Sequence, residues 1–388
     1  MTKTDDREHF EDYREQTQVK HSILAAYLPA YYNILKQRNP NLIYIDGFAG
    51  PGAYIQSTTG TAFDGSPILA MKLIADSADF SKQVSTIFIE SDGFLFSQLR
   101  TRVESSHREH PRIRKPLCLS GTFSEVLKKI LERVKGNLAP TFLFVDPCGV
   151  SGASFETIRA VMAHDKCEAF IFFNIDGVRR IAGLSSLSPV LVELLGSEER
   201  AKTLHEKLRV LEHTTEREEI ILAEYCNALR EDMDVRYIIP FRVEHEAQRK
   251  ASHYLIHATK HPLGFSIMKD VMWRRGHGED QSGGLELRQK GRTNYVPLFD
   301  RHAQIKDEIL HALKGGPVRA ILFYQEWTRR PTDMQCEAAY REALLELEAD
   351  GKVEVLGKDA KNVVSVNDRP WRKNKPTLAK AYFIRLKS

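Results

Sequence analysis

Short apolar runs alternate with amphipathic segments through the first half of the chain. Apolar runs at 42–46, 84–90, 116–120, 141–146 and 168–176 predict strands, and the segments 66–74, 93–104, 124–134 and 154–163 predict helices. An amphipathic helix over 19–38, which Pro29 can kink, precedes the first strand. The strand runs are almost continuously hydrophobic, which is typical of strands covered on both faces. The pattern therefore predicts an α/β fold, a doubly wound parallel sheet with right-handed crossovers.

The second half of the chain adds to this sheet and then changes character. A charged helical region over 187–233 is followed by strand candidates at 235–244 and 253–260, so we expect about seven strands. Residues 276–297 are rich in glycine and charge and predict a loop or linker. Beyond them, two or three helices and a hairpin-like run at 351–358 predict a small module that looks like a winged helix. We thus expect a main domain over 1–275, a linker over 276–297 and a winged-helix-like module over 298–388.

Composition narrows the class of protein. With 388 residues and 42% hydrophobic content, the chain can bury a sizeable core and exceeds the usual size of one domain. No apolar run approaches the length of a membrane span and the N-terminus is charged, so we expect a soluble cytoplasmic protein without a membrane partner. Five cysteines without a C-x-x-C pair favour a reducing compartment over a disulfide framework or a zinc knuckle. A net charge of +4 is compatible with nucleic-acid binding.

The turn after the first strand, in YIDGFAGPGAY from Tyr44 to Tyr54, is rich in glycine. Glycines adopt backbone angles closed to other residues and let the main chain approach a ligand closely. In doubly wound sheets, ligands bind beyond the carboxyl ends of the strands, where Asp46 and this turn are expected. The second strand ends in Glu90, and an acid at this place commonly accepts the hydroxyls of a ribose. The glycines alone also fit a tight turn without a ligand, but together with Glu90 they indicate an adenosine-type cofactor.

The spacing of the glycines distinguishes between two such cofactors. A dinucleotide site reads G-x-G-x-x-G and opens directly into a helix whose N-terminus holds the pyrophosphate. Here the spacing is G-F-A-G-P-G, and a polar insertion over 56–65 delays the next helix until Ser66, an N-cap followed by Pro67. S-adenosylmethionine has no phosphate to hold, so the sequence favours S-adenosylmethionine over NAD.

The fourth strand, in FLFVDPCGVSG, supplies candidate chemistry. Methyl transfer requires the lone pair of the acceptor to be held in line with the methyl group, and positioning supplies much of the rate. The Asp146 carboxylate and the Pro147 carbonyl can accept the two N–H bonds of an exocyclic amine of a base. An isolated Asp-Pro more often only caps a turn, but its place after Asp46 and Glu90 favours the catalytic interpretation. We predict Asp146, Pro147 and Gly149 as the catalytic residues.

These motifs resemble Rossmann-fold methyltransferases that modify amino groups of nucleobases. A helix with Lys20-His21, then IDGFAGPG, FIES and an Asp-Pro motif, is similar to the 23S ribosomal RNA adenine-N6 methyltransferases, whose Asp-Pro is followed by Pro-Tyr. Here Cys148 and Gly149 follow instead, so the aromatic residue that stacks on the flipped base is missing. Asp-Pro-x-Gly is closer to the motif of the tRNA guanine-N2 dimethyltransferases, which makes guanine an alternative target.

The closest resemblance overall is to the three-Cys-motif partner protein family of bacteria. It extends from about Asp12 to the C-terminal module and rests on YIDGFAGPG, FVDPCGVSG, FFNIDG and YLIHATKHPLGFSIMKDVMW. Cys148 stands where that family often has an aromatic residue. The family is named for a neighbouring gene that encodes a protein with three clustered cysteines. The resemblance thus implies such a protein as a partner, and it leaves the reaction open.

Motifs and resemblance together give the predicted binding residues. Those expected to hold S-adenosylmethionine are in the first helix, the glycine turn and the segments after the second and third strands: Lys20, His21, Asp46, Gly47, Phe48, Gly50, Gly52, Glu90, Ser91 and Thr122. Those expected to hold the substrate are Asn174, Lys260, His261 and Lys269. We expect Asn174 and Asp176 to end the fifth strand in FFNIDG, where capping the next turn is an equally good role.

A segment with three histidines raises the question of a metal site. His253, His257 and His261 recur at every fourth residue, which on a helix can gather a metal ion. The segment SHYLIHATKH alternates like a strand, however, so we predict no metal site. In KHPLGFSIMKDVMW, Lys260, His261 and Lys269 are near an expected strand-to-helix turn where a phosphate or a flipped base can lie. The methionines and tryptophan of this segment are more typical of a core.

The C-terminal end bears on partners. RPWRKNKPTLAKAYFIRLKS, residues 369–388, holds seven Lys or Arg and no acid, interleaved with Trp371, Tyr382 and Phe383. Such a segment can track a phosphate backbone and stack bases, or it can form a final strand with its apolar residues inward. We expect a nucleic-acid partner, RNA rather than DNA.

The sequence therefore predicts an S-adenosylmethionine-dependent methyltransferase acting on an exocyclic amino group of a base, in RNA or, second, in DNA. The base must be single-stranded or flipped out of a duplex. The alternative is a non-catalytic or regulatory partner of a three-cysteine-motif protein in a phage-related or defence system, favoured by the missing aromatic residue after Asp-Pro. A nicotinamide-dependent oxidoreductase is a third hypothesis, which the glycine spacing disfavours.

Overall fold

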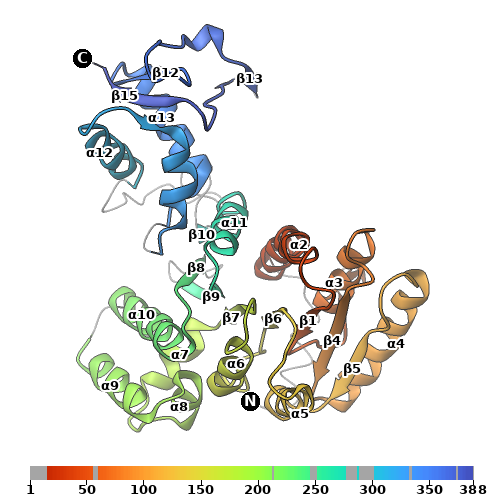
Figure 1. The fold of residues 1–388 in the computed structure, drawn as a ribbon. Coiled ribbons are helices and arrows are strands. Elements are labelled where there is room, and N and C mark those ends of the chain that lie inside the picture. The colour runs from red at the N-terminus through yellow and green to blue at the C-terminus, as the bar shows by residue number, and fades with distance from the viewer. Residues whose placement is uncertain are drawn as a thin grey trace. The chain divides into compact units, whose positions relative to one another are not determined.

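The computed structural model describes residues 15–55, 60–211, 214–244, 251–276, 286–287, 301–331, 334–372 and 375–387 (Figure 1). The chain divides into two compact units, unit 1 over 1–289 and unit 2 over 290–388. Most of the linker expected at 276–297 lies outside the described residues, apart from Gly276 and the short strand β10 (Glu286–Leu287).

Unit 1 is built on one sheet with the strand order β10-β8-β9-β7-β6-β1-β4-β5. Besides β10 its strands are β1 (Leu42–Asp46), β4 (Val84–Glu90), β5 (Leu117–Ser120), β6 (Thr141–Val145), β7 (Glu168–Phe173), β8 (Tyr237–Glu244) and β9 (Ala251–Thr259). These seven are the strands expected from the sequence, and β10 adds a short parallel edge beside β8. Every residue of β6 and β7 is buried, which explains their unbroken hydrophobic runs.

The strand order confirms a mixed α/β fold with a doubly wound sheet. β1 pairs in parallel with β4 on one side and β6 on the other, so the winding reverses there. In chain order the strands β5, β4, β1, β6 and β7 read 3-2-1-4-5. β9 lies between β7 and β8 and is antiparallel to both. We call the edge where β1, β4, β6 and β7 end the carboxyl edge, and the opposite one the amino edge; β9 begins at the former and ends at the latter.

Helices cover both faces of this sheet (Figure 1). One face carries α2 (Glu15–Leu35), α3 (Ser66–Ala75), α4 (Gly93–Glu109) and α11 (Pro262–Trp273). The other carries α5 (Phe123–Val134), α6 (Phe155–Met162), α7 (Ile175–Ala182) and α10 (Thr214–Met233), with α8 (Pro189–Leu195) and α9 (Glu198–Arg209) beside them. A short hairpin, β2 (Ala53–Ile55) with β3 (Ala62–Asp64), follows the glycine turn.

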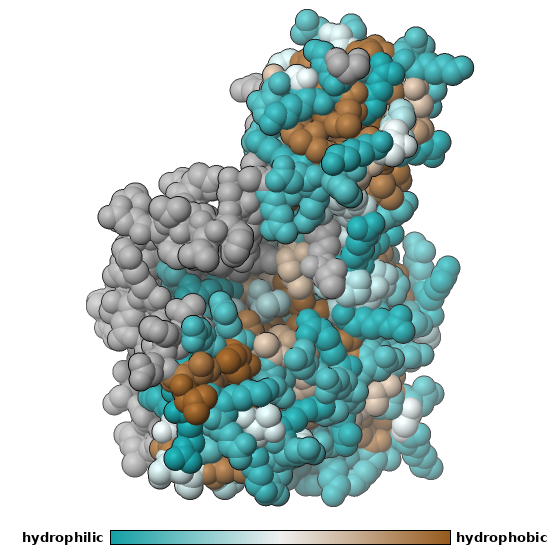
Figure 2. Space-filling view, turned by 90° about the vertical axis from the view of Figure 1, so that its left-hand side faces the viewer, coloured by the Kyte–Doolittle hydropathy of each residue, from teal (hydrophilic) through white to brown (hydrophobic). Residues whose placement is uncertain are grey.

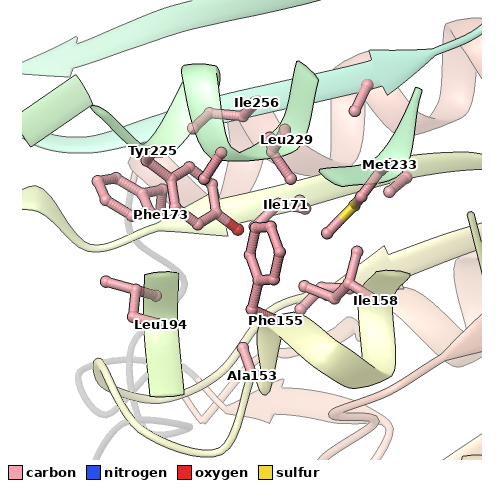
Figure 3. Close-up of a cluster of buried hydrophobic side chains, with 14 of the residues drawn as sticks. Ala153, Phe155, Ile158, Ile171, Phe173, Leu194, Tyr225, Leu229, Met233 and Ile256 are labelled. Carbon is pink, nitrogen blue, oxygen red and sulfur yellow. The ribbon is translucent and has the colours of Figure 1, made fainter. Parts of the chain in front are cut away.

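A large apolar cluster fills the space between the sheet and the α6–α10 layer (Figure 3). Phe155 is fully buried there, among Ile171, Leu194 and Leu229. The chain leaves α8 at Gly196 with φ of 66°, and a Cβ at this position would overlap the Phe155 ring. The turn after α8 therefore needs glycine for both its backbone angle and its packing.

Unit 2 combines helices with a small antiparallel sheet of order β11-β15-β12. Its elements are α12 (Arg301–Leu313), β11 (Val318–Arg319), a π-helical turn (Leu322–Glu326), a 3-10 turn (Trp327–Arg329), α13 (Glu337–Ala349), β12 (Val353–Leu356), a 3-10 turn (Val366–Asp368), the hairpin β13 (Trp371–Arg372) with β14 (Lys375–Pro376), and β15 (Phe383–Leu386). The hairpin-like run expected at 351–358 contains strand β12, which pairs with the distant β15 and also turns back on the segment after it through an antiparallel bridge between Leu356 and Val363.

Two local boundaries differ from the expectation. β7 ends at Phe173, because the Asn174 side chain accepts the Gly177 N–H at 2.8 Å and so caps α7, with Asp176 in its first turn. α3 begins at Ser66 with Gly65 as its N-cap, because the Ser66 side chain interacts with Asp46 instead of capping. The surface in Figure 2 is largely hydrophilic, with hydrophobic side chains in small groups. Within the described residues, no helix is both long and apolar enough to cross a membrane.

Candidate functional site

Three acidic residues meet at the carboxyl edge, as the sequence predicts. Asp46 ends β1, Glu90 ends β4 and Asp146 follows β6. Because β1 pairs with both β4 and β6, the three carboxylates belong to three adjacent strands at the point where the winding reverses. This is the place where doubly wound sheets bind their ligands.

Glu90 holds the glycine turn against β4. Its Oε2 accepts the Gly50 N–H at 2.9 Å and its Oε1 accepts the Asp92 N–H at 2.7 Å. Gly50 and Gly52 have φ of 57° and 78°, in the left-handed region that favours glycine. Burial raises the pKa of Glu90, while the N–H groups of Asp92, Gly50 and Ser91 lower it. A carboxylate offers about four acceptor positions, so Glu90 retains capacity for a further donor such as a ribose hydroxyl.

Asp46 is fully buried beneath the same turn. Its Oδ1 accepts the Phe48 N–H at 3.2 Å, while its Oδ2 has no hydrogen-bond partner among the described residues. Burial raises the pKa of Asp46 to about 7, against the opposing effects of the Ser66 side chain and the Phe48 N–H. An unmatched buried acceptor is costly, so a cationic or N–H-bearing group of a ligand would stabilise it.

Phe48 joins the glycine turn to the loop after β6. Its ring packs on Phe123 with centroids 5.3 Å apart, and a Cβ on Gly152 would lie 3.6 Å from it. Gly47 lies beneath, where a Cβ would be 2.6 Å from the Phe123 ring. Close packing thus explains Gly47, while backbone angle explains the two glycines that follow.

Lys20 and Asp146 form a buried ion pair, which the sequence did not predict. The Lys20 Nζ contacts the Asp146 Oδ2, and the side chains are 2% and 12% exposed. The same Nζ lies 4.8 Å from the centroid of the Phe172 ring. The Lys20 ammonium thus already occupies one oxygen of the Asp146 carboxylate.

Phe172 and His253 form an aromatic pair beside Lys20 that sequence reasoning missed. Their rings stack with centroids 4.3 Å apart and an interplanar angle of 19°. The signal was present in the period-two alternation of SHYLIHATKH, and the strand predicted from it is confirmed. The alternation does not show in which direction the strand runs. Because β9 is antiparallel to β7, His253 lies near the carboxyl edge and His257 lies farther toward the amino edge.

His21 follows Lys20 on α2 and lies beside the β2 hairpin. Its ring meets that of Tyr54 edge-on, with centroids 5.8 Å apart. Burial, and then the nearby Lys20 charge, keep the pKa of His21 well below its ordinary value. His21 is therefore neutral near pH 7, and the positive charge of this helix end at the site belongs to Lys20.

Ser91 and Thr122 also lie at the carboxyl edge, with different environments. Ser91 is exposed directly after Glu90. Thr122 is the N-cap of α5: its hydroxyl accepts the Glu125 N–H at 3.3 Å, and Glu125 accepts the Thr122 N–H at 3.4 Å. This capping box stabilises the start of α5, so the Thr122 hydroxyl already has a structural role.

The loop after Asp146 is open around Gly149. Pro147 is buried and fixes the exit of the chain from β6, whereas Gly149 is partly exposed. A Cβ on Gly149 would meet no atom of the protein within 4 Å. Packing therefore does not require glycine at position 149. The open space beside Gly149 lies three residues after Asp146 in the chain.

The predicted substrate residues separate into two groups. Asn174 lies at the carboxyl edge but caps α7. Lys260 and His261 follow the end of β9 at the amino edge, where Thr259 lies opposite Glu168, the first residue of β7. Lys269 is fully buried in α11 with its Nζ 4.4 Å from the Phe265 ring centroid. The structure therefore does not bring Lys260 and His261 to Asp146.

Among the described residues, no group of three or more His, Cys, Asp or Glu is arranged to hold a metal ion. The residues do fit an adenosine-type cofactor with a cationic part. Glu90 provides acceptors for a ribose, the turn from Gly47 to Gly52 exposes backbone without side chains, and Asp46 carries an unmatched oxygen. The fit rests on this donor and acceptor set.

No protein-family model matches the chain. No curated protein matches its sequence either. Among solved structures, a Legionella pneumophila protein of family DUF519 aligns with 66% of this chain and 88% of its own, at 11% identity and a TM-score of 0.38. A putative caffeoyl-CoA O-methyltransferase from Staphylococcus aureus aligns with 60% and 82%, at 10% identity and a TM-score of 0.29. The methyltransferase domain of bacterial CtHen1-C aligns with 61% and 98%, at 8% identity and a TM-score of 0.31. These likenesses are distant.

Proposed function

We propose that this chain is an S-adenosylmethionine-dependent methyltransferase that acts on an exocyclic amino group of a nucleobase in RNA. The observation that carries the proposal is the meeting of Asp46, Glu90 and Asp146 on three adjacent strands at the winding reversal. Glu90 suits a ribose, the glycine turn with Asp46 suits the methionine part, and Asp146 suits an amine. The strand order is consistent with a Rossmann-like methyltransferase fold.

The protein's contribution to the reaction is positioning. When bound, S-adenosylmethionine supplies an activated methyl group on a positively charged sulfur. Asp146 and the Pro147 carbonyl accept the N–H bonds of the acceptor amine and orient its lone pair. The space beside Gly149 admits the base, and the stacked Phe172 and His253 provide an aromatic surface at the same edge. A base must leave the duplex to reach this edge, so an unpaired or flipped base is the substrate.

Calorimetric binding to S-adenosylmethionine and NAD, with and without RNA, tests the proposal first. We expect saturable binding of S-adenosylmethionine and none of NAD. Glu90→Gln should weaken S-adenosylmethionine binding at least tenfold, because hydrogen bonds to a carboxylate contribute about 1.5–3 kcal/mol and about 1.4 kcal/mol is tenfold in affinity.

The matched control is Glu125→Gln, which changes an acid in the first turn of α5 that takes part in the α5 capping box. It should leave the affinity for S-adenosylmethionine unchanged. Equal affinities for the native chain and Glu90→Gln would remove the ribose assignment. Binding of NAD alone would replace the proposal with an oxidoreductase.

The Lys20–Asp146 ion pair favours a second candidate function. An Asp146 already held by a buried ammonium suits a chain that keeps the fold and serves as a non-catalytic or regulatory partner of a three-cysteine-motif protein. The two functions differ in one measurement: transfer of labelled methyl groups to RNA by the purified chain. Binding of S-adenosylmethionine without methyl transfer to any RNA tested would support the partner function.

We also propose that unit 2 is a winged-helix-like module. Two helices and a π-helical turn with a 3-10 turn accompany the sheet β11-β15-β12, in which the last strand pairs between the first two. A module of this kind suits contact with nucleic acid or protein.

A further inference from the structure

The five loops that lead from a helix into a parallel strand of unit 1 are basic. They hold eight Lys or Arg and three Asp, and they precede β1, β4, β5, β6 and β7 at 36–41, 76–83, 110–116, 135–140 and 163–167. One of the three acids, Asp79, pairs with Lys36. Because the five strands are parallel, all five loops lie at the amino edge. The edge opposite the candidate site thus carries an excess of positive charge.

Seven cations of these loops pair with no acid among the described residues, and we call them the basic rim. They are Arg38, Lys82, Arg112, Arg114, Lys115, Lys135 and Lys166. All except the half-buried Arg114 are exposed. The carboxyl edge of the same sheet presents the acids Asp46, Glu90 and Asp146. Charge therefore separates the two edges.

Arg114 fixes the loop before β5 to the starts of β4 and β1. Its Nε donates to the Lys82 carbonyl at 2.7 Å, its Nη1 to the Ser85 hydroxyl at 3.1 Å and its Nη2 to Asn41 Oδ1 at 2.9 Å. All three acceptors are neutral, so no carboxylate cancels the charge of the guanidinium. The loops of Lys82 and Lys115 are thereby held together with a third positive charge between them.

Lys166 is also held at this edge by neutral groups. Its Nζ donates to Asn39 Oδ1 at 3.0 Å, and its carbonyl accepts the Tyr31 hydroxyl at 2.6 Å. Asn39 and Asn41 are two residues apart in the loop before β1. This one loop therefore binds a cation from the β5 side and a cation from the β7 side, and it neutralises neither.

Two lysines of the basic rim have a backbone conformation that lysine rarely adopts. Lys135 and Lys166 have φ of 50° and 59°, in the left-handed region. Glycine and asparagine take this conformation more readily than lysine does. Backbone preference therefore does not account for a lysine at either position, which agrees with a use for the two side chains.

The length of the basic rim matches a row of phosphates. It crosses five adjacent strands, and at a spacing of about 4.8 Å this distance is about 19 Å. One strand of a duplex carries about one phosphate per 3.4 Å along its axis, so about five phosphates fit. In the five loops, all of which the structure describes, the only Phe, Tyr or Trp is Phe80, which is 1% exposed. The surface therefore offers charges for phosphates and no such ring on which an unpaired base could stack.

We infer that the basic rim binds the phosphate backbone of a double-stranded RNA stem. Such contacts position a nucleic acid without reading its sequence. The inference deepens the proposed function and rests on it for the choice of RNA. β1, with five residues, places the rim about 17 Å from the candidate site, so the reacting base belongs to an unpaired part beyond the stem. Lys260 and His261, expected from the sequence to contact the substrate, also lie at the amino edge and would contact the stem.

Binding of the full chain to a fluorescein-labelled RNA hairpin tests the inference without any cofactor. A stem of about 12 base pairs is about twice as long as the basic rim. The triple variant Lys82→Gln, Arg112→Gln, Lys115→Gln should lower the slope of log affinity against log salt by about 3, at about 1 per lost phosphate contact. It should also raise the KM for RNA in methyl transfer and leave the affinity for S-adenosylmethionine unchanged.

The matched control is the triple variant Lys128→Gln, Lys207→Gln, Arg209→Gln, which removes three exposed positive charges from α5 and α9. It should keep the native salt slope, and both variants should unfold at the native temperature. Equal slopes for the two triple variants would overturn the inference. So would tighter binding of the native chain to the unpaired strand than to the stem. Tighter binding to polyglutamate than to the stem would also overturn it and would assign the rim to an acidic protein.

The same measurements separate this inference from the proposed function. Native salt slope in the rim variant, with methyl transfer intact in the native chain, removes the rim assignment alone. A reduced slope in the rim variant, without binding of S-adenosylmethionine to the native chain, removes the methyltransferase and keeps the RNA-binding rim.

Discussion

Two buried carboxylates of unit 1, at opposite edges of the sheet, differ in how completely the protein surrounds them. At the amino edge, Glu168 accepts hydrogen bonds from the Tyr27 hydroxyl at 2.5 Å and the Thr259 hydroxyl at 2.8 Å, and its Oε2 lies 3.0 Å from His257 Nε2. At the carboxyl edge, Asp46 accepts the Phe48 N–H on Oδ1 and interacts with the Ser66 side chain, while its Oδ2 has no hydrogen-bond partner among the described residues.

One glycine near each carboxylate edge shows the same difference in how closely the protein packs. A Cβ on Gly264 would overlap the Glu168 carboxylate and come within 2.9 Å of the Tyr27 hydroxyl, so the backbone closes over the amino-edge cluster. A Cβ on Gly149, beyond Asp146, would meet nothing within 4 Å. The comparison teaches that buried charge alone does not identify a site. A carboxylate matched by its own neighbours is structural, and one with an unmatched acceptor is suited to a ligand.

The largest expected effect concerns the pH dependence of stability at Asp46. Burial raises the pKa of Asp46 from 3.8 to about 7, so between these values the folded chain binds more protons than the unfolded chain. Stability from this group is then present at low pH and is lost as pH rises toward 7. A shift of about three units corresponds to about 4 kcal/mol. The free energy of unfolding of Asp46→Asn, relative to that of the native chain, should therefore increase by about this amount between about pH 4 and about pH 8.

Urea unfolding of both chains across this pH range measures the difference directly. Parallel stability curves for the native chain and Asp46→Asn would mean that Asp46 is as well matched as Glu168, and the comparison would break.

The second effect separates methyl transfer from cofactor binding. Asp146→Asn should lower methyl transfer to RNA about 100-fold or more, since misplacing an acceptor group has effects of this size, with the affinity for S-adenosylmethionine unchanged. It should also lower the free energy of unfolding, because it leaves the buried Lys20 ammonium without its counter-ion. Glu168→Gln should lower the free energy of unfolding by about 3 kcal/mol, because it disturbs a buried network, and should leave the affinity for S-adenosylmethionine unchanged. Radiolabelled methyl transfer, calorimetry and urea unfolding on both variants provide the measurements. The comparison fails if Glu168→Gln alone abolishes cofactor binding.

The sequence predicts the sheet, and the position of the three acids at its carboxyl edge, for a physical reason. Strands buried on both faces must be apolar throughout, as β6 and β7 are, and polar residues mark where each strand ends. The pairing of Lys20 with Asp146 joins residues 126 positions apart and leaves no local pattern. Strand direction also leaves no local pattern, because the alternation of apolar and polar residues in β9 is the same for a parallel and an antiparallel strand. For this reason we expected Lys260 near the substrate, whereas it lies at the amino edge.

The third effect uses the two glycines as a matched pair. Gly264→Ala should destabilise unit 1 by about 2 kcal/mol, because its Cβ overlaps a buried carboxylate that cannot move away. Gly149→Ala should change stability by less than about 0.5 kcal/mol, as exposed substitutions do, but should raise the KM for RNA by filling substrate space. Thermal unfolding measures the stability of both variants, and steady-state kinetics measure their KM for RNA. Equal destabilisation would show that the loop after Asp146 is packed as tightly as the amino edge.

The smallest effect compares two buried tyrosines. Tyr27 donates its hydroxyl to Glu168, so Tyr27→Phe should lower the free energy of unfolding by about 1–2 kcal/mol. The Tyr44 hydroxyl is buried next to the Asp46 strand end and has no hydrogen-bond partner among the described residues, so Tyr44→Phe should be neutral or slightly stabilising. Urea unfolding at constant pH resolves the two. A larger loss for Tyr44→Phe would indicate a bound water molecule at that hydroxyl.

The helix α2 has a consequence for how unit 1 comes together in time. It contributes Lys20 to one edge and Tyr27 to the other, yet their partners Asp146 and Glu168 are 126 and 141 residues later in the chain. During synthesis α2 is complete long before β6, β7 and β9 exist, so the part of α2 that packs on these strands lacks its partners until then. Contacts of such long range are made late and slow the folding of a domain. Hydrogen exchange during refolding should show the amides of α2 protected last, after those of β1 and β4.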